Sequence, residues 1–231
     1  MKVSVIIPVY NEAKTIKEIL KKVTDSDVVD EIIIVDDFSK DDTMKILESL
    51  SLKGVKIYSH DKNRGKGAAI RTGLKNASGD IIIFQDADLE YDPGDYPRLV
   101  KPIKEGKADV VYGSRFLNRK DLFHCKKVFY LTHFIGNKFL NFMVMLLYGA
   151  RLTDMETCYK VIKKEILNGI DLTARGFEIE PEITAKLLRK GVKIYEVPIS
   201  YVPRDYQEGK KISWRDGLKA LYVLVKYRVG K

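Results

Sequence analysis

Short apolar segments alternate with amphipathic segments along the first half of the chain. Each apolar segment is four to seven residues long and has polar residues on both sides, as is typical of a strand buried on both faces. The segments between them repeat apolar residues every three or four positions, which predicts helices that cover a sheet. The predicted strands are 3–9, 32–35, 55–58, 81–84 and 109–112, and the predicted helices are 14–23, 43–50, 67–76 and 96–104.

This alternation predicts an α/β fold with a mainly parallel central sheet flanked by helices. In open sheets of this kind, ligands bind beyond the carboxyl ends of the strands. The residues directly after the predicted strands are rich in polar and charged side chains, so we expect them to form one cleft. These residues are 10–12, 36–37, 60–64, 86–88 and 113–115.

The second half of the chain is less regular. Residues 128–148 predict a long helix or a helix pair, 183–189 a helix and 193–197 a strand. Residues 214–227 predict a closing helix, in which Leu218, Leu221, Tyr222 and Val225 are expected to face inward.

Charge is distributed unequally between the two halves. The 231 residues include 41 Lys+Arg and 32 Asp+Glu, a net charge of +9. Residues 1–115 hold 19 basic and 20 acidic residues, a net of −1, whereas residues 116–231 hold 22 and 12, a net of +10. This asymmetry predicts an anionic partner such as nucleic acid, a membrane surface or a phosphorylated ligand. A hydrophobic content of 45% excludes a disordered chain.

The chain carries no evident targeting signal. It lacks a signal-peptide cleavage pattern, and its two cysteines do not form a disulfide framework, so we expect a cytoplasmic protein. The most apolar segment, 128–148, is interrupted by polar residues, and we predict no transmembrane segment. His133, Asn137 and Asn141 recur there at every fourth position as one polar stripe. The stripe fits either a buried core helix or an interfacial helix at a membrane surface.

Three groups of polar residues are candidates for chemistry. Asp86 and Asp88 follow an apolar strand and can converge on Mg²⁺ or Mn²⁺, with Glu90 as a further ligand; alternatively they are solvated loop acids. Asp37 follows another strand and is a candidate ligand for ribose or a base, whereas Asp41 and Asp42 are expected to cap a helix.

The third group opens a predicted helix. Residues 63–67, Asn-Arg-Gly-Lys-Gly, combine glycines with cations, and Lys66 is the candidate for binding an anion there. An ordinary glycine-rich turn is the alternative.

Taken in order, several segments resemble family-two glycosyltransferases with the GT-A fold. They are VSVIIPVYNE, IIIVDDFSKDDT, NRGKGAAIRTG, SGDIIIFQDADLEY and VVYGSRF. In the second half, TDMETCYKV, GFEIEPEI and EVPISYVPRDYQEGKKISWRDGLKALY resemble the polyprenyl-phosphate sugar synthases, the group that includes dolichol-phosphate mannose synthase. The resemblance covers nearly the whole chain, which we interpret as one domain, 1–231, with a nucleotide-sugar half, 1–115, and an acceptor half, 116–231.

The resemblance assigns roles to individual positions. It implies a nucleotide pocket at Pro8, Tyr10, Glu12 and Asp37, and metal ligands at Asp86, Asp88 and Glu90. It also implies phosphate-binding cations at Arg115, Arg204 and Lys211, and an acceptor-side acid at Asp154. Lys210 is a further cation of the right type on the acceptor side. The second arginine that some mannose synthases carry after Gly-Ser-Arg is absent, and Lys126, Lys127 or His133 are the candidates to replace it.

The implied reaction moves a hexose from a nucleoside-diphosphate sugar, GDP-mannose or UDP-glucose, to a polyprenyl phosphate with inversion. An acceptor phosphate is already an anion near pH 7, so the reaction needs cations rather than a general base, although Glu178 or Glu180 is available as one. The acceptor and the basic second half together predict peripheral contact with the cytosolic membrane face.

Three alternatives stay open. The same fold can transfer sugar to a soluble or glycan hydroxyl, which requires a general base. A sugar-1-phosphate nucleotidyltransferase also has an α/β fold with metal-binding acids, but its glycine-rich activating loop is absent near the N-terminus. A nucleic-acid-binding module would fit the basic charge, but no recognition motif supports it, so we expect no nucleic-acid partner.

Overall fold

The computed structural model describes the backbone of residues 1–50, 54–117, 128–204 and 214–230, and side chains throughout these ranges except at 128–133 and 214. The strands are β1 (Val3–Val9), β2 (Glu31–Asp36), β3 (Val55–Ser59), β4 (Ile81–Phe84), β5 (Val110–Ser114), β6 (Lys160–Lys163) and β7 (Ile194–Pro198). The helices are α1 (Ile16–Thr24), α2 (Thr43–Ser49), α3 (Lys66–Asn76), α4 (Tyr96–Lys104), α6 (Val128–Tyr148), α7 (Lys164–Asn168), α8 (Ile179–Arg189) and α9 (Trp214–Val229), with a 3₁₀ turn at Pro93–Asp95.

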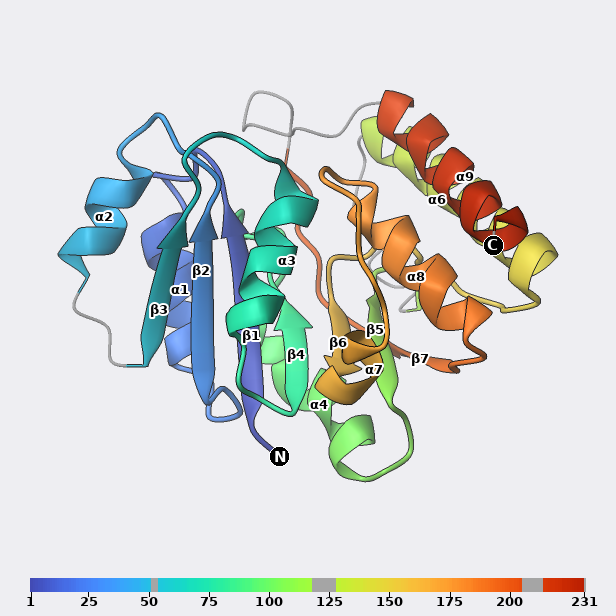
Figure 1. The fold of residues 1–231 in the computed structure, drawn as a ribbon, viewed down its shortest axis with the longest axis horizontal. Coiled ribbons are helices and arrows are strands. Elements are labelled where there is room, and N and C mark those ends of the chain that lie inside the picture. The colour runs from blue at the N-terminus through green and yellow to red at the C-terminus, as the bar shows by residue number, and fades with distance from the viewer. Residues whose placement is uncertain (51–53, 118–127, 205–213, 231) are drawn as a thin grey trace.

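Within the described ranges, the strands form one seven-stranded sheet in the order β3-β2-β1-β4-β6-β5-β7 (Figure 1). Neighbouring strands are parallel except at β6, which is antiparallel to both β4 and β5. The predicted α/β fold with a mainly parallel sheet is therefore confirmed.

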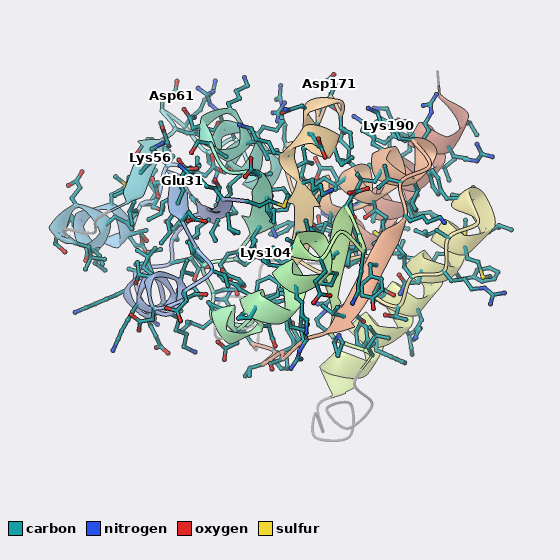
Figure 2. The ribbon with its side chains drawn as sticks, turned by 90° about the horizontal axis from the view of Figure 1, so that it is seen from below. Glu31, Lys56, Asp61, Lys104, Asp171 and Lys190 are labelled. Carbon is teal, nitrogen blue, oxygen red and sulfur yellow. The ribbon has the colours of Figure 1, made fainter. Side chains whose placement is uncertain are left out.

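Helices cover both faces of the sheet. Seen from below, α1 and α4 lie on one side of the strands, and α3 and α7 lie on the other (Figure 2). The strands β2 and β4 are buried along their whole length, which explains why their sequences are continuously apolar. The apolar residues of α1 that recur at helical spacing, Ile16, Ile19, Leu20 and Val23, are all buried in the core.

The strand β6 was not predicted from the sequence. It has four residues, with lysine at both ends, so no apolar run marks it. Lys160 is nevertheless fully buried, because its ammonium donates to the Glu180 carboxylate at 2.5 Å. A charge buried with a partner on a different element gives no signal in the local sequence pattern.

The helices α6 and α9 pack side by side at the end of the sheet near β5 and β7 (Figure 1). A second apolar cluster joins them to α8 through buried residues that include Val144, Ala185 and Leu224. The predicted inward face of the closing helix is wrong in part: Leu218, Tyr222 and Val225 are 59%, 65% and 38% exposed. The helix α9 has apolar residues around most of its circumference, and its partners contact the face that carries Leu224 instead.

Candidate active site

A cleft of about 800 Å³ opens at the carboxyl ends of the parallel strands, with α6 and α9 forming part of its wall. Many of the residues that the sequence predicted for the site line this cleft. They are Pro8, Tyr10, Glu12, Asp37, Lys66, Asp86, Asp88, Glu90, Arg115 and Arg204. Lys126, Lys127, Lys210 and Lys211 lie outside the described residues, as does the side chain of His133. Residues that are far apart in the sequence thus face one cavity.

Arg204 connects three acidic side chains in this cleft. Its guanidinium donates to Asp88 Oδ2 at 2.8 Å and to Glu12 Oε2 at 3.2 Å. Its backbone N–H donates to Glu90 Oε1 at 2.9 Å, and the other oxygen of Glu90 accepts from the Tyr201 hydroxyl. The arginine therefore compensates a concentration of negative charge that comes from loops after β1 and β4.

Asp86 and Asp88 differ in their electrostatic surroundings. Burial raises the pKa of Asp88 above its usual range, and the neighbouring carboxylates of Asp86 and Glu90 add to this against the opposing effect of Arg204. Burial acts in the same direction on Asp86, but the Lys66 ammonium at 2.7 Å lowers its pKa overall. The site thus holds more negative charge than its own cations compensate.

A row of buried charges extends from Asp86 through Lys66 and Glu180, which also line the cleft, to the buried Lys160. Lys66 lies 3.0 Å from Glu180 Oε1, and Lys160 donates to Glu180 Oε2. Glu178 accepts the backbone N–H of Arg175 and Gly176 at the start of α8. Neither glutamate that the sequence offered as a general base is free to act as one, because both have structural partners.

Arg115 is fixed by a two-pronged ion pair. Its Nε and Nη2 donate to the two oxygens of Asp154, each at 2.7 Å, and its backbone N–H donates to Asp154 Oδ2 at 3.0 Å. The Tyr201 ring lies beside the guanidinium, with its centroid 5.1 Å away. Asp154 is fully buried, so it positions Arg115 from behind and does not line the cleft.

Asp37 shapes the loop that leads into α3. Its carboxylate accepts the backbone N–H of Arg64 at 2.8 Å and of Gly65 at 2.6 Å, and it lies 2.7 Å from His60 Nδ1. Gly65 has φ +90°, and a Cβ there would collide with the Arg175 carbonyl. These contacts place Lys66 at the first position of α3, facing Asp86. Helix capping is done by Asp41, whose carboxylate accepts the Thr43 N–H, rather than by Asp42.

Asn137 and Asn141, the two residues of the polar stripe of α6 whose side chains the structure describes, face the protein. Asn137 donates to Asp154 Oδ1 at 3.0 Å, and Asn141 donates to the Thr153 carbonyl and accepts the Met155 N–H. The opposite side of the helix is apolar and open to solvent, with Phe139 49% and Leu146 65% exposed. Asn137 and Asn141 are therefore buried, as expected for a core helix, whereas the apolar side of α6 is exposed.

Sequence reasoning missed several residues of the cleft. Tyr91 and Tyr201 flank Arg115, and Glu156 lines the cavity between Asp154 and Cys158. Burial raises the pKa of Glu156 to about 7, although Lys160 opposes the shift. The sequence did contain a signal for Glu156, because it lies two residues after Asp154 in the segment TDMETCYKV that carries the family resemblance.

The carboxylates do not form a closed metal cage. Among the described residues, no three acidic, histidine or cysteine side chains are placed to hold a metal ion. Mg²⁺ and Mn²⁺ sites at phosphate substrates typically use one or two protein carboxylates, which Asp86 and Asp88 provide. In the part of the chain that the structure describes, no helix combines the length and hydropathy needed to cross a membrane.

The arrangement of acids and cations after the parallel strands agrees with a family match. The sequence model described as "Glycosyl transferase family 2" matches residues 4–170, which include β1 to β6. The chain belongs to glycosyltransferase family 2. This confirms the family that the segments of the first half resemble.

Curated relatives of this family-two chain match nearly its whole length. A UDP-N-acetylglucosamine–dolichyl-phosphate N-acetylglucosaminyltransferase from Methanococcus voltae is 32% identical and covers 98% of this chain and 96% of the relative. A dolichol-phosphate mannosyltransferase from Pyrococcus furiosus is 33% identical over 91% of this chain, which spans 59% of that relative. These names confirm the resemblance to the polyprenyl-phosphate sugar synthase group.

Solved structures share the fold. A glucosyl-3-phosphoglycerate synthase from Mycobacterium tuberculosis, in complex with Mn²⁺, UDP and phosphoglyceric acid, superposes with a TM-score of 0.74. It is 21% identical and covers 99% of this chain and 78% of its own. A complex of the same synthase with Mg²⁺ and UDP gives a TM-score of 0.68 at 22% identity. The GT-A fold predicted from the resemblance is confirmed.

Proposed function

We propose that this glycosyltransferase moves a hexose from a nucleoside-diphosphate sugar to a polyprenyl phosphate with inversion of configuration. The observation that carries the proposal is one cleft in which Asp86 and Asp88 face Arg115 and Arg204 beside the exposed apolar helices α6 and α9. The relatives that act on dolichyl phosphate support the same acceptor class. The donors to test first are UDP-N-acetylglucosamine, UDP-glucose and GDP-mannose.

Asp86 and Asp88 are the residues that would hold Mg²⁺ or Mn²⁺. The fit rests on the donor set, because the carboxylates of Asp86 and Asp88 line the same cleft beside Glu90 and supply the oxygen ligands that these cations prefer. A bound cation would neutralise the charge that develops on the leaving nucleoside diphosphate.

The protein's own cations account for the rest of the reaction. Arg115 is held rigidly by Asp154, so its remaining N–H groups can face an anion in the cleft without reorganising. The acceptor phosphate is already deprotonated near pH 7, which agrees with the structural pairing of Glu178 and Glu180. Direct attack by the phosphate oxygen on the anomeric carbon converts an α-linked donor into a β-linked product.

The outer side of α6 and α9 supports peripheral contact with a membrane. The apolar side chains exposed there are Ile135, Phe139, Phe142, Met145, Leu146, Leu218, Tyr222, Val225 and Val229. The exposed cations on the same two helices are Lys138, Arg215, Lys219, Lys226 and Arg228. An apolar surface edged by cations fits the interface of an anionic bilayer. A lipid-linked phosphate would then reach the cleft from the side on which α6 and α9 lie.

A screen of donors against polyprenyl phosphate with Mg²⁺ or Mn²⁺ tests this function. We expect one nucleotide sugar to be transferred, and we expect Asp88→Ala to lower kcat/KM by about 100-fold or more because a charge-stabilising ligand is lost. The matched control is Asp42→Ala, which removes an exposed aspartate that pairs with Lys45 at the surface. Transfer to soluble hydroxyl acceptors but not to polyprenyl phosphate would contradict the proposal, as would full activity of Asp88→Ala.

A further inference from the structure

Glu156 has a buried oxygen with no partner. In the described part of the chain, Oε1 of Glu156 is shielded from solvent and meets no hydrogen-bond donor. The remaining acidic side chains that line the cleft have a hydrogen-bond or ion-pair partner; they are Glu12, Asp37, Asp86, Asp88, Glu90, Glu180 and Asp216. A buried carboxylate oxygen without a donor is costly, and its retention in a cavity indicates a ligand that supplies the donor.

The described cations near Glu156 are bound to other groups. Lys66 pairs with Asp86 and Glu180, and Lys160 donates to Glu180 and to the Thr157 carbonyl. Arg115 is bound on two sides by Asp154. Among the described residues, no cation supplies this donor, and we infer that a bound molecule supplies it.

The position of Glu156 selects the part of the substrate it would contact. Two residues before it, Asp154 holds Arg115, the cation proposed for phosphate. Two residues after it, Cys158 Sγ lies 3.7 Å from the carbonyl of Phe84, which precedes Asp86 by two residues. Glu156 thus stands in the chain between a residue that holds Arg115 and one that contacts the strand before Asp86, and it lines the same cleft as Arg115 and Asp86, the cleft in which the transferred sugar would bind.

The chemistry of a carboxylate also indicates that Glu156 would contact the sugar rather than the phosphates. Phosphate and diphosphate are anions that a carboxylate repels, whereas a hexose is neutral and carries adjacent hydroxyl groups. A carboxylate accepts strong hydrogen bonds from hydroxyl groups, and its two oxygens can accept from two of them. We propose that Glu156 binds ring hydroxyls of the donor sugar and so determines which sugar is transferred. This inference rests on the proposed function.

The test combines variants of Glu156 with modified donors. Wild type, Glu156→Gln and Glu156→Ala are assayed with the transferred nucleotide sugar and with analogues that lack the hydroxyl at carbon 3, 4 or 6. We expect wild type to prefer the parent donor over at least one analogue by about 100-fold in kcat/KM, because a missing hydroxyl leaves Glu156 unpaired. Glu156→Ala should reduce that preference to about threefold or less, with Glu156→Gln intermediate because its amide oxygen still accepts.

A binding measurement separates sugar recognition from a structural role. With Mn²⁺ and without acceptor, Glu156→Ala should weaken the calorimetric affinity for the nucleotide sugar about tenfold and leave that for the nucleoside diphosphate within about twofold. Glu12→Gln is the matched acidic control, because it lies in the Arg204 cluster and should lower kcat/KM for all donors without changing their ratio.

Three results would overturn the inference. One is an unchanged preference among donors in Glu156→Ala while wild type transfers sugar, which leaves the proposed function standing. The second is an equal loss of about 1000-fold or more on every donor with an altered acidic limb of the pH profile, which assigns Glu156 as a general base. The third is a wild-type protein that transfers sugar from no nucleotide sugar, which contradicts the proposed function as well.

Discussion

Arg204 takes part in ion pairs in the structure and is also proposed to bind phosphate, and its guanidinium cannot do both fully at once. Its guanidinium compensates Asp88 and Glu12 in the structure, yet it is also one of the cations proposed for the phosphates. A divalent cation at Asp88 and the guanidinium of Arg204 compete for the same carboxylate oxygens. Binding of the metal with the nucleotide would therefore release the arginine toward the phosphates.

Arg204→Gln tests this competition directly. Without the guanidinium the acidic cluster has one positive charge fewer, so we expect Mn²⁺ to bind about tenfold more tightly in the absence of nucleotide, while sugar transfer falls. Titration of Mn²⁺ followed by electron paramagnetic resonance measures the affinity. Arg151→Gln, an exposed arginine outside the cleft, is the control. An affinity that is unchanged or weaker in Arg204→Gln would show that the arginine does not oppose the metal.

The pKa of Glu156 predicts a pH dependence of stability. Burial raises this pKa from 4.5 to about 7 in the folded protein, so the folded state binds the proton more tightly than the unfolded chain does. The stabilisation is fully present below pH 4.5 and is lost as the pH rises through 7. Relative to wild type, Glu156→Gln should gain up to about 3 kcal/mol in free energy of unfolding between pH 4.5 and 8.

Urea unfolding of both proteins at pH 5 and pH 8, without metal or nucleotide, measures the effect. The difference between variant and wild type isolates Glu156 from other groups whose pKa burial raises, such as Glu196. Equal differences at the two pH values would contradict the assigned shift.

At the scale of elements, the sequence predicted the strands that are buried on both faces and the helices with one apolar side. The strands β1 to β5 were found close to their predicted bounds. Runs such as residues 32–35 and 81–84 have few other structural explanations, whereas the edge strand β3 is partly exposed and carries Lys56. The strand β6 and the inward face of α9 were not predicted correctly. Lys160 in β6 is buried only because Glu180 on α8 pairs with it, and the face of α9 depends on where α6 lies.

The same distinction holds for the candidate site. The loops after the strands could be named in advance because parallel strands end at one edge of the sheet. The pairing of Lys66 with Asp86 and Glu180, and the missing partner of Glu156, depend on side chains that are far apart in the sequence. No local pattern determines such distances.

The exposed side of α6 predicts where the protein touches lipid. Phe142→Asp with Leu146→Asp should lower co-sedimentation with anionic vesicles about tenfold, because two apolar side chains that are 52% and 65% exposed and lie outside the cleft lining are replaced by charges that repel the surface. Transfer to a short, water-soluble prenyl phosphate should persist. The control is Ile57→Asp on β3, at the opposite end of the sheet. Unchanged vesicle binding by the double variant would contradict this orientation.

At the scale of the whole molecule, the charge asymmetry matches the proposed separation of the cleft into a donor side and an acceptor side. The half with a net charge of −1 supplies Asp86 and Asp88, and the half with a net charge of +10 supplies Arg204 and the helix α9. The basic half thus carries the side on which an anionic lipid would approach.

This distribution predicts that binding to lipid and binding to nucleotide respond differently to salt. Raising NaCl from about 50 to 500 mM should lower affinity for anionic vesicles about tenfold or more, since exposed charges are screened over several ångströms. Affinity for nucleoside diphosphate with Mn²⁺ should change about threefold or less, because the cleft is partly closed to solvent. Vesicle flotation and calorimetry at the two salt concentrations measure both. Equal salt sensitivity would contradict separate surfaces.

The asparagine side of α6 has a consequence for how far a lipid must move. Asn137 holds Asp154, which holds Arg115, while the opposite side of the same helix is open to the surroundings. An α-helix with its side chains is about 10–12 Å thick. In the proposed orientation, the helix α6 alone separates the bilayer surface from Arg115, the arginine proposed to bind phosphate. A prenyl chain can then stay in the bilayer during the reaction, and only its head group has to cross one helix width.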